Sequence, residues 1–93
     1  MAKTDYTIEA QQNLIKIVHY LATDVTRHTT AGEIAEALEI SKSKAMWTLH
    51  NLRERGWAEQ SGDGWRLGVG IVKISTAVQK GISDTAQRYL GQS

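Results

Sequence analysis

The sequence predicts a mainly α-helical protein with a small β-hairpin, and three observations lead to that fold class. Apolar residues recur at helical spacing in residues 7–23, 31–39 and 42–55. Two short strand-like stretches then flank a glycine-rich turn within residues 57–67. Helical spacing returns in residues 71–80.

Composition limits the chain to one small domain, or to one domain with an appended arm. Its 93 residues are 41% hydrophobic and 23% charged, which is enough apolar material for a single modest core. It has no cysteine, so disulfides and thiolate metal sites are excluded. It has no apolar run of membrane-spanning length and no basic-then-apolar leader, so we expect a cytoplasmic protein without a membrane partner.

The first helix, residues 7–23, has an unusually wide apolar face. At helical spacing its apolar side chains cover about half of the circumference, which is more than one packed face needs. One side would contact the domain's own core, and the other could contact a second subunit. A polar loop is expected over residues 24–29.

Two closely spaced helices follow. Thr30 and Glu33 fit a capping box, which predicts a short helix ending near Glu39. Only Ile40 separates it from Ser41, a good N-cap for a third helix that runs to about residue 55. Gly56 is placed to end that helix in a left-handed conformation.

The rest of the chain predicts a hairpin and two further helices. Residues 57–60 and 65–67 are the expected strands, joined by the turn 61–64. A helix over residues 71–80 is expected to break at Gly81, and Ser83 could cap a last short helix ending near Leu90.

A short helix, a tight turn and a longer helix with a basic start are typical of a helix-turn-helix, and the hairpin makes it a winged one. Helical angles turn Ala45, Leu49 and Leu52 inward, so that the opposite face could enter the major groove of DNA. The candidate DNA-binding residues are Thr30, Ser41, Lys42, Ser43, Lys44, Trp47, His50, Asn51 and, in the wing, Arg66.

Other roles for these side chains stay open. Lys42, Lys44 and His50 could simply be solvated helix residues. Trp47 could lie against a sugar or a thymine methyl, or pack on the wing or on another subunit. Arg66 could approach phosphates or the minor groove, or pair with a glutamate, Glu59, on the other strand.

The charge distribution favours a basic patch near the third helix. The net charge of +1 divides into −3 for residues 1–40, +2 for residues 41–66 and +2 for residues 67–93. A basic middle suits a polyanion, although an ordinary solvated surface would show the same balance.

The run from Thr30 to Trp57, together with Trp65-Arg66-Leu67-Gly68, resembles the winged helix-turn-helix of IclR-type transcription regulators. The similarity extends over about residues 8–90, with residues 71–79 matching the family's linker helix. Trp47 stands where the family often has arginine, and Lys44 where it often has threonine, so details of the DNA contacts would differ.

The resemblance implies a DNA-binding homodimer whose contacts come from the first helix and the linker helix. The candidate dimerisation residues are then Ile8, Ile15, Ile71, Ile74 and Val78. Residues 1–68 would form the DNA-binding domain and residues 69–93 a dimerisation arm. Family members also carry an effector-binding domain. Its absence here predicts either a small regulator of the kind that phages and mobile elements encode, or a fragment, with no small-molecule effector.

No catalytic motif is present: the sequence lacks a nucleophile elbow, a phosphate-binding glycine loop and metal-ligand spacing among its three histidines. We therefore expect no enzyme activity, no metal and no cofactor. The sequence favours sequence-specific binding of double-stranded DNA by a small transcriptional regulator. The alternative is a winged-helix adaptor that binds other proteins, for example in a phage or replication assembly, and the weak net charge supports it.

Overall fold

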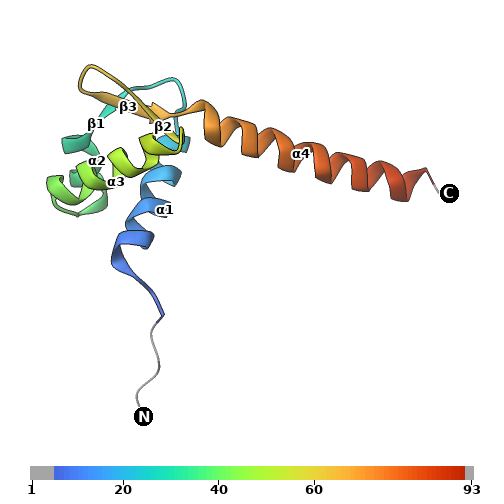
Figure 1. The fold of residues 1–93 in the computed structure, drawn as a ribbon, viewed down its shortest axis with the longest axis horizontal. Coiled ribbons are helices and arrows are strands. Elements are labelled where there is room, and N and C mark those ends of the chain that lie inside the picture. The colour runs from blue at the N-terminus through green and yellow to red at the C-terminus, as the bar shows by residue number, and fades with distance from the viewer. Residues whose placement is uncertain (1–5, 92–93) are drawn as a thin grey trace, which may run out of the picture.

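A computed structural model describes residues 6–91 of the chain. Its elements in chain order are α1 (Glu9–Ala22), β1 (Thr29–Thr30), α2 (Ala31–Leu38), α3 (Lys42–Glu54), β2 (Ala58–Ser61), β3 (Gly64–Leu67) and α4 (Val69–Leu90). Helices α1, α2 and α3 pack together beside a small sheet, and α4 projects away from them as a single rod (Figure 1). The expected fold class, a mainly helical winged helix-turn-helix, is confirmed.

The helix-turn-helix forms at the capping residues that the sequence indicates. The Thr30 hydroxyl accepts a hydrogen bond from the Glu33 amide at 3.2 Å, and the Ser41 hydroxyl accepts from the Lys44 amide at 3.1 Å. Between the helices, Glu39 takes a left-handed conformation with φ of 57°, which makes the turn tight. A capping box also has a hydrogen bond from the backbone amide of its first residue, here Thr30, to the Glu33 side chain. That bond is not formed, because the Glu33 carboxylate accepts from Arg27 at 2.7 Å instead.

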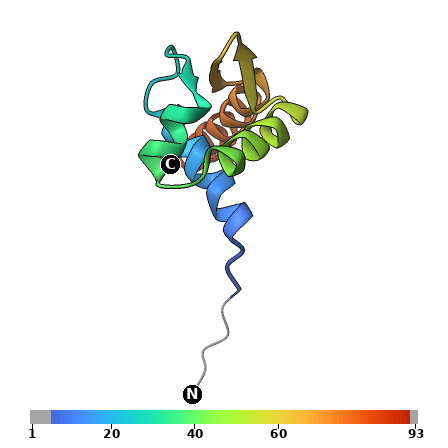
Figure 2. The same ribbon diagram turned by 90° about the vertical axis from the view of Figure 1, so that its left-hand side faces the viewer.

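The wing is a three-stranded antiparallel sheet in the order β1-β3-β2. Strands β2 and β3 form the expected hairpin, with Glu59 opposite Arg66 and the turn glycine Gly62 at φ of 59°. Strand β1, whose residues were expected to be the end of a loop and a helix cap, pairs Thr29 with Trp65. In Figure 2 the hairpin (ochre) stands above α3 (yellow-green).

One core lies between the three N-terminal helices and the sheet. Ile17, Ile34 and Leu49 are fully buried there, and Trp65 of β3 is 1% exposed. Trp65 is the largest buried side chain, so the tryptophan of β3 supplies much of the volume that phenylalanine would supply in another core. The core therefore fixes the wing to the helices through β3.

The C-terminal part differs from the expectation of two helices separated at Gly81. Helix α4 runs without interruption through Gly81 to Leu90, and Ser83 caps nothing. Glycine keeps its backbone N–H, so inside a helix it lowers stability by about 1 kcal/mol without ending the hydrogen-bond ladder. At the other end, α4 is attached to the domain by two backbone hydrogen bonds, from Gly68 N to Trp57 O and from Gly70 N to Gly56 O, both 2.8 Å.

Candidate nucleic-acid interface

Helix α3 buries one face and exposes the other, as the helical spacing predicts. Ala45 and Leu49 are fully buried and Leu52 is 3% exposed. Thr48 is buried beside them, and its hydroxyl donates to the Lys44 carbonyl at 2.7 Å, so burial leaves no polar atom without a partner. The helix is therefore held firmly by its inner face, and its outer face can meet a partner without rearrangement.

The outer face of α3 carries a large exposed aromatic ring. Ser43, Lys44 and Trp47 are all exposed, and Trp47 has 68% of its surface accessible. Asn51 is also exposed, but its amide donates to the Trp47 carbonyl at 2.8 Å, which directs that group toward the backbone. Ser41 is occupied as the N-cap of the helix. Ser43 and Trp47, in contrast, have no side-chain hydrogen bond within the described residues.

Lys44 does not extend freely into solvent. Its ammonium group donates to the carboxylate of Glu9, at the start of α1, although the two residues are 35 apart in sequence. This hydrogen bond and the lysine charge hold the pKa of the Glu9 carboxyl below its usual value. Both side chains are largely exposed, so the pair is weak and can exchange for another anion.

The junction between α3 and the wing is a cluster of ring and cation contacts. The His50 and Trp65 rings form a T-shaped pair, with centroids 5.4 Å apart. The Arg53 guanidinium lies over the same indole at 5.7 Å and donates to the Gln60 side chain of β2 at 2.7 Å. His50 is half-buried, so it is less available than an outward residue would be.

Arg53 lies in this region but is not among the residues predicted to bind DNA. Its position in the last turn of α3 predicts only a favourable interaction with the helix dipole. Its partners on the wing come from a different part of the sequence, so no local pattern could have indicated them. In the structure Arg53 links the outer end of α3 to the wing.

In the wing, Arg66 adopts the second of its two expected arrangements. Its Nε donates to the Glu59 carboxylate at 2.6 Å, across the β2–β3 pair. Both side chains keep more than two fifths of their surface exposed, so this is a surface pair of low strength. Arg66 therefore remains on the surface of the hairpin, with its charge offset by Glu59.

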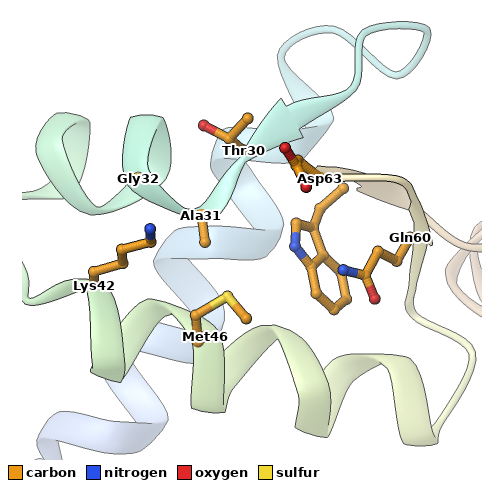
Figure 3. A pocket seen from close by; sticks show the side chains of 8 residues that line it. Thr30, Ala31, Gly32, Lys42, Met46, Gln60 and Asp63 are labelled. Atoms are coloured by element: carbon orange, nitrogen blue, oxygen red, sulfur yellow. The ribbon is translucent and has the colours of Figure 1, made fainter.

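A shallow pocket of about 410 Å³ opens between α3, the wing and the start of α2. Figure 3 shows Lys42 reaching from α3 toward the first turn of α2, with Gln60 and Asp63 on the wing side of the pocket. Thr30 lies on the α2 side, so two of the candidate DNA-binding residues line this pocket. The acid Asp63 at its rim makes the pocket mixed in charge.

The candidate dimerisation residues lie on two separate helices. Ile8 at the N-cap of α1 and Ile15 within it are 53% and 49% exposed, and Ile74 and Val78 of α4 are 43% and 54% exposed. Ile71, near the attachment point of α4, is half-buried. None of the described side chains of α4 is fully buried, and its apolar residues beyond Ile71 are exposed.

Within residues 6–91 no three His, Asp or Glu side chains gather as a metal site would require. No helix in that part of the chain combines the length and apolar character needed to cross a bilayer.

The match to a known family decides what kind of domain this is. The model of the IclR helix-turn-helix domain matches residues 12–62, which is more than half of the chain. The chain belongs to the IclR helix-turn-helix domain family. The match covers most of α1, the helix-turn-helix and the first part of the wing, so this IclR-type domain is a helix-turn-helix domain of the DNA-binding kind found in transcription regulators.

Solved structures share the fold. The Zalpha domain of ORF112 from Cyprinid Herpesvirus3, determined for its binding to Z-DNA, is 25% identical, with 61% of this chain and 93% of that chain covered and a TM-score of 0.56. MepR, a transcription regulator of the Staphylococcus aureus multidrug efflux pump MepA, is 21% identical with a TM-score of 0.59, and the match covers 94% of this chain but 64% of MepR.

A third structure, an O-methyltransferase family protein from Burkholderia thailandensis, matches 71% of this chain and 23% of its own at 21% identity, with a TM-score of 0.45. No curated protein sequence matches the chain significantly.

Proposed function

We propose that this IclR-type domain binds double-stranded DNA in a sequence-specific manner as a homodimer and serves as a small transcriptional regulator. The observation that supports it most is the outer face of α3: an exposed Trp47 and Ser43, on a helix whose inner face is fully packed, beside a wing. Family membership and the likeness to DNA-binding proteins support the same function.

In the proposed complex α3 lies in the major groove. Ser43 and Trp47 face base edges, with the indole against a thymine methyl or the adjacent sugar, because an apolar ring can contact a methyl group there. Lys42 and Lys44 contact phosphates at the start of the helix. Phosphate contacts add affinity for every sequence, whereas the base contacts discriminate among sequences.

The wing supplies the second set of contacts. Arg66 approaches the backbone beside α3 and exchanges Glu59 for a phosphate. Thr30, His50 and Asn51 lie around the edges of the same surface and position the domain rather than read bases. Two copies would then place two copies of α3 in grooves one helical turn apart, about 34 Å, on a roughly palindromic operator.

A mobility-shift titration tests the proposal. The intact protein is titrated at low salt with fragments from the neighbouring genome, with a mixed-sequence B-form duplex and with an alternating d(CG) duplex that is brominated to hold the Z-form at low salt. Tighter binding of one genomic fragment, weakened by added salt, is expected. Absence of any shift would remove DNA binding as the function, and binding of the Z-form duplex alone would contradict major-groove reading by α3.

A protein-binding adaptor is the second candidate, and one observation favours it. Lys44 and Arg66, two of the cations nearest the proposed interface, are each paired with a carboxylate of the same chain. A surface with its cations offset and an exposed tryptophan also suits a protein partner. The titration separates the two candidates, since an adaptor gives no salt-sensitive shift.

A further inference from the structure

The pocket between α2, α3 and the wing is lined by a buried group that lacks a hydrogen-bond partner. Trp65 is 1% exposed, and its indole N–H forms no hydrogen bond within residues 6–91. A buried tryptophan N–H usually has a partner. Every fully buried side-chain nitrogen or oxygen in the described chain has one, so this N–H still reaches the surface that the indole lines, which is the pocket. The pocket therefore offers a donor to an acceptor on a ligand.

Two unpaired charges lie on opposite sides of the same pocket. Lys42 of α3 lies on the side of α2, and Asp63 of the hairpin turn lies on the side of the wing (Figure 3). Neither side chain forms an ion pair or a hydrogen bond within the described residues, whereas Arg27, Lys44 and Arg66 are each paired with a carboxylate. A cation and an anion that face one hollow without meeting favour an occupant that carries both charges.

The side of the pocket that α2 forms suits a carboxylate. Ala31 and Gly32, the first two residues of α2, line it, and the positive end of the helix dipole lies there. A Cβ on Gly32 would meet Thr30 Oγ1 at 4.0 Å as its nearest contact outside the helix, so the space beside this glycine is open. Lys42 adds a full positive charge on this side.

The rest of the pocket suits an ammonium group and an apolar body. The Asp63 carboxylate only accepts hydrogen bonds, and it would repel a second carboxylate. Met46 of α3 is half-buried and lines the pocket, where its thioether can contact a methyl group or an aromatic ring. The volume of about 410 Å³ lies at the lower end of the roughly 300–1,000 Å³ that small-molecule sites occupy.

We propose that this pocket binds an α-amino acid with an apolar side chain. Its carboxylate lies between Lys42 and the first turn of α2 and accepts a hydrogen bond from the Trp65 N–H. Its ammonium group donates to Asp63, and its side chain lies on Met46. In the resemblance that the sequence shows, effector binding belongs to a separate domain, whereas this site lies within the winged domain itself.

The amino acid would also compete with DNA. In the proposed complex Lys42 contacts a phosphate, and the carboxylate of the amino acid would hold the same ammonium group. A bound amino acid should therefore lower the affinity for duplex DNA. This consequence rests on the proposed function, whereas the binding of the amino acid does not.

An NMR titration of the isotope-labelled intact protein with L-leucine and with L-phenylalanine tests the binding. The Trp65 indole proton is expected to move downfield in a saturable way, because its N–H gains an acceptor, while the indole proton of Trp57, which lies outside the pocket, stays in place. A dissociation constant in the millimolar range is expected for so small a ligand in a shallow pocket. No saturable change at Trp65, up to the solubility limit of both amino acids, would overturn the proposal.

Two analogues of L-phenylalanine test which charges the site requires. Hydrocinnamate lacks the ammonium group, and phenethylamine lacks the carboxylate. Each should bind about threefold more weakly than L-phenylalanine, which is the size of effect usual for one exposed ion pair. Binding of hydrocinnamate as tight as that of L-phenylalanine would overturn the assignment to a zwitterion, and so would equally tight binding of phenethylamine.

Substitutions of the two charged side chains test the protein's part. Lys42→Gln and Asp63→Asn should each raise the dissociation constant for L-phenylalanine about threefold, without unfolding, because both side chains are exposed. Asp63→Asn should also bind hydrocinnamate and L-phenylalanine alike, since the group that distinguishes them is gone. Lys73→Gln and Asp84→Asn make the same changes in charge on α4 and should bind as the wild type does. Equal weakening in these controls would overturn the site.

The mobility shift with the best duplex is then repeated in saturating L-phenylalanine. A weaker shift is expected, and an unchanged shift would overturn the competition. A protein that binds the amino acid but shifts no duplex would reject DNA binding and leave the assignment of the pocket intact.

Discussion

Lys44 is exposed on the surface of α3 and is also held in an ion pair. Helical spacing correctly turns it to the outer face of α3, but its ammonium group is held by Glu9 of α1. The lowered pKa of the Glu9 carboxyl reflects this pair, so the pair is intact above the carboxyl's ordinary pKa and is lost as the pH falls through the lowered value. The carboxylate and a DNA phosphate would compete for the same lysine.

Glu9→Gln should therefore strengthen DNA binding several-fold at low salt, because Lys44 is released and one negative charge leaves the interface. Fluorescence anisotropy with a labelled duplex measures the change. Asp84→Asn is the control: it makes the same change in charge and releases Lys80, but on α4. Equal effects of the two substitutions would show that only net charge matters, and an unchanged affinity in Glu9→Gln would exclude competition at Lys44.

Trp47 is the residue on which base recognition depends most in the proposed complex. Trp47→Ala should lower affinity for the best duplex roughly tenfold, equivalent to about 1.4 kcal/mol, and affinity for random duplex less. Its exposure of 68% predicts an unchanged melting temperature. Val25→Ala, which alters an exposed residue of the loop before β1, is the control and should change neither quantity. A uniform loss on all duplexes would assign Trp47 to backbone contacts instead.

Among the elements, the start of α4 lies very close to the backbone of the turn between α3 and β2. A Cβ on Gly68 would overlap the carbonyl oxygen of Gly56, and a Cβ on Gly70 would come within 2.7 Å of the same oxygen. These glycines allow the start of α4 to lie directly on the turn between α3 and β2, where both donate backbone hydrogen bonds. Backbone contacts thus hold the start of α4 against this turn.

Gly68→Ala should destabilise the domain by about 1–3 kcal/mol, the usual cost of forcing atoms into a packed site. That corresponds to a fall in melting temperature of at least several degrees for a domain of this size. Gly32→Ala is the matched control, because its Cβ would meet nothing closer than 4.0 Å. A melting temperature equal to that of the wild type in Gly68→Ala would show that α4 is not anchored as the structure has it.

The elements that local chemistry specifies were predictable from the sequence. Thr30 and Ser41 cap their helices through bonds three residues along the chain, and such signals are visible in a sequence. Strand β1 was missed because two residues are too short to show an alternating pattern, and their partner β3 lies far along the chain. The predicted break at Gly81 was wrong because glycine weakens a helix without interrupting its hydrogen bonds.

The candidate interface was also only partly predictable from the sequence. Periodicity predicted the inward side chains of α3 and most of the outward ones, but not that His50 is half-buried against Trp65. It could not predict the partners of those side chains, since Lys44 meets α1 and Arg53 meets the wing through tertiary packing.

At the scale of the whole molecule, the domain and its arm divide two tasks in the proposed function. The packed N-terminal part presents α3 and the wing. Helix α4 extends away from them, and most of its apolar residues are exposed. Two copies joined by their arms would double a basic patch that is weak in one copy. The modest charge of +1 would then be compatible with DNA binding.

Ile71→Glu combined with Ile74→Glu should separate the two copies without unfolding residues 30–67, because negative charge at these two positions opposes pairing of the α4 helices. Light scattering reports the mass, and circular dichroism the fold. Lys73→Glu on the polar side of α4 should remain dimeric. Unfolding of the double variant would instead assign this stripe to the core of a single chain.

The central claim is that the outer face of α3 and the adjoining wing contact duplex DNA. Mapping amide and indole chemical-shift changes by NMR, as a duplex is added to the protein, tests it most directly. We expect the largest changes at Ser43, at the Trp47 indole and around the hairpin turn at Gly62, with small changes on the outer face of α4. Changes confined to α4, or none at a low salt concentration, would contradict it.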